Sequence, residues 1–224
     1  PSSSRANAQV KLQSTGSDEI TYTYNLHDGY ETFPLTSGSG SYTVGVFENI
    51  EGTSYSTLFT QAIDVTIQDE FGPYLYANQY VNFSADSKVI SKAMELSASA
   101  NDDLEVIENV YNYIITNFTY DYDKAASVQS GYLPNVDEVL ASQTGICFDY
   151  AAVMASMLRC ERIPTRLEVG YMGDVYHAWI STYIKDNGWV NGIIEVDGND
   201  WKLMDPTFAA TSSEPKVFVS QTDE

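Results

Sequence analysis

Apolar and polar residues alternate along three runs within the first seventy positions. In residues 20–26, 42–47 and 63–68 every second side chain is apolar, which is the period of a half-buried β-strand. Glycine, serine and asparagine gather between these runs, at 37–40 and 49–52, and favour turns. The pattern predicts a small antiparallel sheet or sandwich. Residues 9–82 are therefore expected to form a small all-β, sandwich-like N-terminal domain, preceded by a polar tether at residues 1–8.

From residue 86 onward the hydrophobic period becomes that of an α-helix. Asp102 and Asp103 precede a long apolar stripe and can cap the start of a helix there. Asn135 and Glu138 have the spacing of a capping box before a short helix that runs to Ser142. Two helices are expected before that short one. Their apolar stripes comprise Val89, Ile90, Ala93 and Met94, and then Ile107, Val110, Tyr111, Ile114, Ile115 and Phe118.

A further helical pattern starts at Cys147 and is followed by strands. Thr144 and Gly145 precede the helix and can supply the turn into it. Residues 176–184 alternate like a strand, and so do residues 201–205, which end at Pro206. We predict an α+β domain over residues 83–224, in which the cysteine helix packs on an antiparallel sheet. The apolar face of that helix carries Tyr150, Ala151, Met154 and Leu158.

Cys147 lies where a reactive thiol is expected. In the first turn of a helix, unpaired backbone N–H groups and the positive end of the helix dipole favour the thiolate, which is the nucleophilic form. The same N–H groups can stabilise an oxyanion on an attacked carbonyl carbon. The alternative is a buried structural cysteine, which is the usual situation of a lone cysteine. The polar residues before Cys147 favour the reactive interpretation.

Two later residues are candidates for partners of that thiol. The chain has 2 histidines. His27 belongs to a turn-like His-Asp-Gly segment, which leaves His177 as the candidate base. Asp205 ends the next predicted strand, and it would reach His177 if the two strands were antiparallel neighbours. The alternatives are a packed core histidine and an ordinary turn at Asp205–Pro206.

Together these segments resemble the transglutaminase-like superfamily, a branch of the papain-like cysteine enzymes, in its bacterial secreted or surface form. The helix start fits G-x-C-x-[DE]-[YF]-[AS], the helix-to-strand crossing fits R-x-x-x-I-P-[AT]-R, and H-A-W and D-P-T follow. A weaker similarity extends upstream through residues 117–121. The matching residues are Gly145, Cys147, Asp149, Tyr150, Ala151, Arg159, Ile163, Pro164, Thr165, Arg166, His177, Ala178, Trp179, Asp205, Pro206 and Thr207.

The resemblance implies a papain-like core with Cys147 as nucleophile, His177 as base and Asp205 as the residue that orients the base. Members of the superfamily transfer amines to glutamine, hydrolyse amides, cleave peptides or remove glycans, and some have lost activity. The expected function is acyl transfer or amide hydrolysis through a thioester on a protein or peptide substrate, with either an amine or water as acceptor. A cysteine peptidase and a catalytically silent extracellular binding module are the alternatives.

Three more residues are candidates for oxyanion stabilisation or for the substrate cleft. Gln143 lies four positions before the thiol and has a side-chain amide, and Tyr120 has a hydroxyl. Trp179 shares a strand face with His177. Each of these also suits a local structural role. The segment from Asp197 to Asp200 lacks the full ligand loop of a calcium site and predicts a hairpin. We expect neither a metal nor a cofactor.

The composition narrows the range of partners. The chain has 31 acidic and 11 basic residues, for a formal net charge of −20, which argues against nucleic acid or an anionic membrane as partner. Its 2 cysteines are expected to lie on one helix about 20 Å apart, so we predict no disulfide and a filler thiol at Cys160. No apolar run approaches the roughly 18 residues that span a bilayer. We expect a secreted or surface-exposed monomer whose leader or anchor lies outside this sequence.

Overall fold

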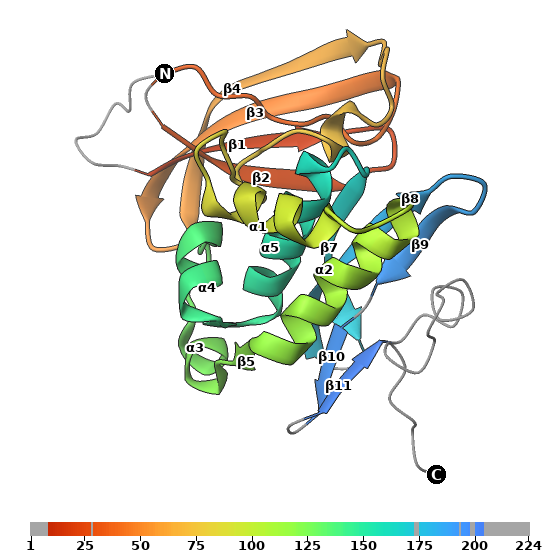
Figure 1. Ribbon diagram of the computed structural model, residues 1–224. Coiled ribbons are helices and arrows are strands. Elements are labelled where there is room, and N and C mark those ends of the chain that lie inside the picture. The colour runs from red at the N-terminus through yellow and green to blue at the C-terminus, as the bar shows by residue number, and fades with distance from the viewer. Residues whose placement is uncertain (1–8, 28, 173–174, 193, 198–199, 204–224) are drawn as a thin grey trace. The chain divides into compact units, whose positions relative to one another are not determined.

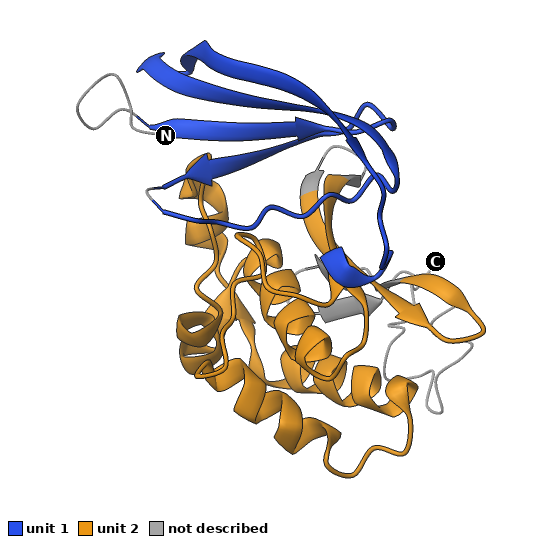
Figure 2. Ribbon diagram, turned by 90° about the horizontal axis from the view of Figure 1, so that it is seen from above, with its two compact units in different colours: residues 1–73 blue, residues 74–224 orange. Residues whose placement is uncertain are grey.

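The computed structural model describes residues 9–27, 29–172, 175–192, 194–197 and 200–203 (Figure 1). Contacts divide the chain into two compact units, residues 1–73 and 74–224 (Figure 2). The division falls nine residues before the predicted domain boundary. The reason is that Tyr74, Leu75 and Val81 are buried and Arg159 donates to the backbone oxygen of Tyr76, so this segment belongs to the second unit. The predicted tether at residues 1–8 and Asp205 lie outside the described residues.

The described part of the first unit forms one four-stranded antiparallel sheet. Its strands are β1 (Val10–Thr15), β2 (Thr21–Leu26), β3 (Gly40–Glu51) and β4 (Ser54–Val65), in the order β2-β1-β3-β4. The described residues of this unit form one sheet, whereas the predicted sandwich-like domain would need two facing sheets. Strand β1 was missed because its alternation is short, with apolar side chains only at Val10 and Leu12, and β4 begins nine residues before the run that predicted it. The β3–β4 pairing is irregular at two places, which breaks the alternation there.

The first half of the second unit is mostly helical and contains two short strands. The helices are α1 (Lys88–Ser97), α2 (Asp103–Asn117), α3 (Tyr122–Ser127), α4 (Val136–Ser142) and α5 (Cys147–Cys160), and the 3₁₀ helix η1 (Gly72–Tyr74) spans the division between the two units. Strands β5 (Thr119–Tyr120) and β6 (Thr144–Gly145) form a parallel pair. The predicted caps are confirmed, since Asp102 accepts a hydrogen bond from the backbone of Glu105 and Asn135 accepts one from Glu138. Met94 of the first predicted stripe is 62% exposed and does not join the core.

The second half of this unit contains the sheet on which α5 packs. Strands β7 (Thr165–Met172), β8 (Val175–Ile184) and β9 (Gly188–Gly192) form an antiparallel sheet, and β10 (Ile194–Asp197) pairs with β11 (Asp200–Leu203) in a hairpin. Helix α5 lies between this sheet and helices α1, α2 and α4 (Figure 1). The residues of α5 from Asp149 to Arg159 are buried. The predicted α+β class, with a cysteine helix against an antiparallel sheet after an N-terminal sheet, is therefore confirmed.

Among the described residues, no helix has the length and apolar character needed to span a membrane. The two cysteines lie at the first and last positions of α5 and are both free thiols. The predicted absence of a disulfide between them follows directly, because the length of the helix separates them. Burial and the neighbouring Glu161 carboxylate raise the pKa of Cys160 to about 11, as expected for a filler thiol.

Candidate active site

Cys147 is the first residue of the buried helix α5, as the sequence predicted. The preceding residue, Ile146, has an extended backbone and carries no side-chain acceptor that could cap the helix. The backbone N–H groups of the first turn are therefore available to stabilise negative charge near the Cys147 thiol. The side chain of Cys147 is half-buried. A thiol in this position is accessible enough to react and dry enough for nearby charges to act on it strongly.

The imidazole of His177 forms a hydrogen bond with the Cys147 thiol. His177 lies in β8 and is 9% exposed. Burial alone would raise the pKa of Cys147. The hydrogen bond and positive charge of His177, together with backbone N–H groups of Ala178 and Phe148, outweigh burial and lower that pKa below its ordinary value. The structure thus brings together two of the three predicted catalytic residues and favours the thiolate.

Tyr120 reaches the same cysteine from another element. The parallel pairing of β5 with β6 places Tyr120 opposite Gly145, two residues before Cys147. Its phenol oxygen hydrogen-bonds both the backbone and the thiol of Cys147. Burial, followed by the nearby charge of Cys147, raises the pKa of Tyr120 to about 12. The hydroxyl therefore stays protonated near neutral pH and can donate a hydrogen bond to an oxyanion formed beside the Cys147 N–H.

Trp179 lies two residues beyond His177 on β8. Its indole N–H donates to the Glu168 carboxylate over 2.9 Å, and the Ser181 hydroxyl donates to the same carboxylate oxygen. Gly170 leaves room for the indole, since a Cβ there would lie 2.9 Å from the ring of Trp179. The half-buried indole is thus fixed on the strand that carries His177. This position suits a cleft residue and does not suit an oxyanion donor, because the indole N–H is already used.

The other two predicted residues are not brought to the thiol by the described structure. Gln143 caps α4 in a left-handed conformation, and its side-chain amide donates to the Tyr113 hydroxyl over 3.4 Å. Asp205 lies outside the described residues. The expected pairing of its strand with β8 is not observed among them, because β8 pairs with β7 and β9, and β11 pairs with β10. The orienting role of Asp205 stays a prediction.

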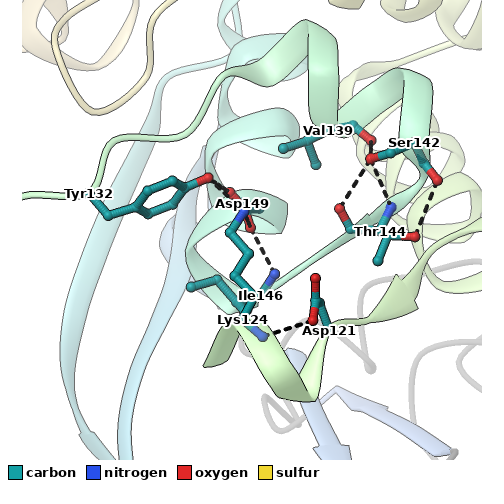
Figure 3. Close-up of polar contacts among 8 residues, drawn as sticks. All are labelled: Asp121, Lys124, Tyr132, Val139, Ser142, Thr144, Ile146 and Asp149. Carbon is teal, nitrogen blue, oxygen red and sulfur yellow. Dashed lines mark hydrogen bonds and ion pairs between the residues drawn. The ribbon is translucent and has the colours of Figure 1, made fainter. Parts of the chain in front are cut away.

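Sequence reasoning missed a buried ion pair at the start of α5. The Asp149 side chain is fully buried and receives three donors: the Ile146 backbone N–H at 2.9 Å, the Lys124 ammonium at 2.6 Å and the Tyr132 hydroxyl at 2.5 Å (Figure 3). The helix-start motif singled out Asp149. Nothing in the sequence pattern pointed to Lys124 or Tyr132, which lie 25 and 17 residues away and meet Asp149 only in the folded chain.

Gly145 makes room for this buried carboxylate. A Cβ at Gly145 would lie 2.7 Å from the Cβ of Asp149 and 2.8 Å from one of its carboxylate oxygens. We therefore expect Gly145→Ala to lower the free energy of unfolding by about 1–3 kcal/mol, measured by urea denaturation. Gly72→Ala is the matched control, because its Cβ would approach Asp69 only to 3.7 Å, an ordinary contact. Equal stability of the two variants would contradict the proposed close packing at Gly145.

A thiol at a helix start that is hydrogen-bonded to a strand histidine is the arrangement that a cysteine nucleophile and its base require. Residues 90–192 match the model of the transglutaminase-like superfamily. The predicted resemblance to that superfamily is confirmed over this segment, which carries Cys147 and His177 and ends before Asp205.

Individual relatives are distant. The chain is 26% identical over 111 residues to UPF0252 protein MJ1282 of Methanocaldococcus jannaschii, an alignment that covers 44% of this chain and 32% of that protein. A crystal structure named as a putative cysteine protease from Cytophaga hutchinsonii is similar at 18% identity and a TM-score of 0.47, over 83% of this chain and 76% of that one. The periplasmic domain of TgpA from Pseudomonas aeruginosa is similar at 13% identity and a TM-score of 0.44, over 84% and 89%.

Proposed function

We propose that this chain is a cysteine-dependent acyl-transfer or amide-hydrolysing enzyme that works through a thioester on Cys147. The observation that carries the proposal is the hydrogen bond between Cys147 and His177 at the start of α5, which lowers the pKa of the thiol. A structural cysteine in a buried helix has no need of such a partner, and Cys160 at the other end of α5 shows the opposite shift.

The first half of the mechanism forms the thioester. The Cys147 thiolate attacks the carbonyl carbon of a carboxamide, and the carbonyl π-electrons move to oxygen. The backbone N–H of Cys147 and the Tyr120 hydroxyl donate to the resulting oxyanion. As the oxyanion collapses, the C–N bond breaks, and protonated His177 gives its proton to the departing nitrogen. Ammonia or an amine leaves.

The second half resolves the thioester. His177 is now neutral and removes a proton from water or from a primary amine as that group attacks the thioester carbonyl. The oxyanion forms again at the same donors, and the C–S bond breaks to return the Cys147 thiolate. Water as acceptor gives hydrolysis, and an amine gives a new amide. We propose Asp205 as the residue that orients His177, protein or peptide as the substrate, water or an amine as the acceptor and a location outside the cytoplasm.

Substrate assays test the proposal directly. The purified chain is incubated with a glutaminyl peptide and a fluorescent primary amine, with ammonia release and amine incorporation followed in parallel. Incorporation indicates acyl transfer, and ammonia without incorporation indicates hydrolysis. A peptide library followed by mass spectrometry detects cleavage of backbone amides, which would reassign the enzyme as a peptidase. No turnover in any assay, together with an ordinary thiol at Cys147, would contradict the proposal.

Tyr120→Phe tests the proposed oxyanion donor. We expect kcat to fall about 100-fold, in the range measured when one oxyanion donor is removed, with little change in KM. The matched control is Tyr122→Phe, which removes the hydroxyl of a 56% exposed tyrosine two residues away and should leave the rate within about twofold. A Tyr120→Phe variant with the wild-type kcat would assign the hydroxyl a structural role only.

A further inference from the structure

We propose that Lys124 is a positioning residue for the nucleophile: its ammonium group neutralises the buried Asp149 carboxylate, which in turn holds the first turn of α5 and therefore Cys147. This inference rests on the proposed function, since it concerns the reactivity of that thiol. Lys124 does not touch the thiol, so its effect is transmitted through Asp149 and the helix start.

The Asp149 side chain stabilises the start of α5, which the side chain of the N-cap residue Ile146 cannot do. Ile146 has no polar side chain, and the Asp149 carboxylate accepts its backbone N–H over 2.9 Å. This bond holds the residue immediately before Cys147. It also requires that a carboxylate with 0% exposure remain inside the protein. Burial of an ionised carboxylate costs several kcal/mol unless a partner compensates for the lost water.

Lys124 and Tyr132 provide that compensation. The Lys124 ammonium lies 2.6 Å from one Asp149 oxygen, and the Tyr132 hydroxyl lies 2.5 Å from the other. The ammonium also contacts Tyr132 itself, 2.7 Å from its hydroxyl and 4.4 Å from the centre of its ring. Burial would lower the pKa of Lys124, but the bonds to Asp149 and Tyr132 outweigh it and raise that pKa. The lysine is therefore positively charged at every pH where the enzyme would work.

Residues 120–124 carry both Lys124 and Tyr120, whose hydroxyl contacts the Cys147 thiol. Tyr120 contacts Cys147, and the Asp121 N–H donates to the Gly145 oxygen over 2.9 Å. Lys124 binds Asp149 (Figure 3). Residues 120–124 thus run alongside residues 145–149 and contact them at three successive places. A change in the Lys124–Asp149 pair alters the one stretch of chain that also positions Tyr120.

The charged groups around the Lys124–Asp149 pair determine how its loss would affect the Cys147 thiolate. His177 and Tyr120 face Cys147, and Lys124 and Tyr132 face Asp149. Asp121 and Glu138 line a polar cavity of about 510 Å³ together with Lys124. Without the Lys124 ammonium, its positive charge no longer balances the negative charges of the Asp149, Asp121 and Glu138 carboxylates. An uncompensated Asp149 two residues from the thiol opposes the thiolate, and a protonated Asp149 is a weaker acceptor for Ile146.

The test compares Lys124→Met, Lys124→Arg and Lys92→Met by the alkylation rate of Cys147 against pH. Lys92 is the matched control: its ammonium is also 2.6 Å from a carboxylate, that of Glu95, and 5.2 Å from a tyrosine ring, that of Tyr113, but Glu95 is exposed. All proteins carry Cys160→Ser, and folding is checked by circular dichroism. Iodoacetamide is the probe, so no substrate needs to be known.

We expect Lys124→Met to raise the apparent pKa of Cys147 by at least about one unit and to slow alkylation at pH 6 about tenfold. Lys124→Arg should restore the rate to within about threefold, because the charge is kept, and Lys92→Met should match the parent. A folded Lys124→Met protein with the parent pH profile would overturn the inference, even if its melting temperature fell, because a merely structural pair would change stability alone.

A second variant covers the case in which Lys124→Met does not fold. Tyr132→Phe removes one of the three donors to Asp149 and keeps the charge, so we expect a smaller rise in the Cys147 pKa. An unchanged profile would overturn the inference. The parent protein separates this failure from failure of the proposed function: a low thiol pKa in the parent that Lys124 and Tyr132 variants do not alter rejects only the positioning role.

Discussion

Replacing Cys147 with alanine is expected to abolish turnover, with a loss of at least about 10⁴-fold in kcat. In the proposed mechanism the Cys147 sulfur is the only protein atom that forms a covalent bond to the substrate carbonyl carbon, so no neighbouring group can replace it. The substitution removes a half-buried side chain at the first position of α5, where alanine is an excellent helix residue. We therefore expect the fold to be retained, as measured by circular dichroism and thermal unfolding beside the amine-incorporation and ammonia assays.

Cys160→Ala is the matched control for this prediction. It removes the other thiol of the same helix, at its last residue, where burial keeps the pKa high. This variant should keep the parental rate within about twofold, since Cys160 lies a helix length away from the site. If Cys147→Ala retained activity while Cys160→Ala lost it, the nucleophile would be assigned to the wrong end of α5.

Replacing His177 with alanine is the prediction with the next largest effect. His177 lowers the thiol pKa by its hydrogen bond and charge, and in the mechanism it moves every proton. We expect kcat/KM to fall by about 10³–10⁴-fold, with the residual rate supplied by the oxyanion donors and substrate binding. Steady-state kinetics with the glutaminyl peptide measures this loss.

The chain offers a natural control for His177. His27 lies after β2 in an exposed position and hydrogen-bonds Glu31 over 2.8 Å. His27→Ala should therefore leave kcat/KM unchanged within about twofold. Exogenous imidazole should restore part of the activity of His177→Ala and none of the activity of Cys147→Ala. Full activity in His177→Ala would reject the thiol–imidazole mechanism.

The parts of the fold that were predictable are those whose cause is local. The first residue of α5, the strand around His177 and the caps at Asp102 and Asn135 are set by periodicity and by side chains that bond to backbone groups three residues away. For the same reason the site was partly predictable. A thiol at a helix start and a histidine on a strand are local features, and the family resemblance supplied their order.

The parts that failed depend on contacts between distant residues. Strand β1 has a weak pattern of its own and is defined by pairing with β2 and β3. Met94 follows the helical period of α1, but no element in the described part of the chain covers it. The direct pairing expected between β8 and the strand before Asp205 is not found among the described residues, because β7 and β9 occupy both edges of β8 and β11 pairs with β10. Lys124 gave no signal because an ion pair has no period in sequence.

The central claim is that His177 keeps Cys147 as a thiolate, and the alkylation rate of Cys147 against pH tests it most directly. Intact mass spectrometry follows the labelling in Cys160→Ser protein, with and without His177→Ala. The account predicts rapid labelling that persists near pH 6 and is lost in His177→Ala. A rate that rises only around an ordinary thiol pKa of about 8.5, in both proteins alike, would contradict it.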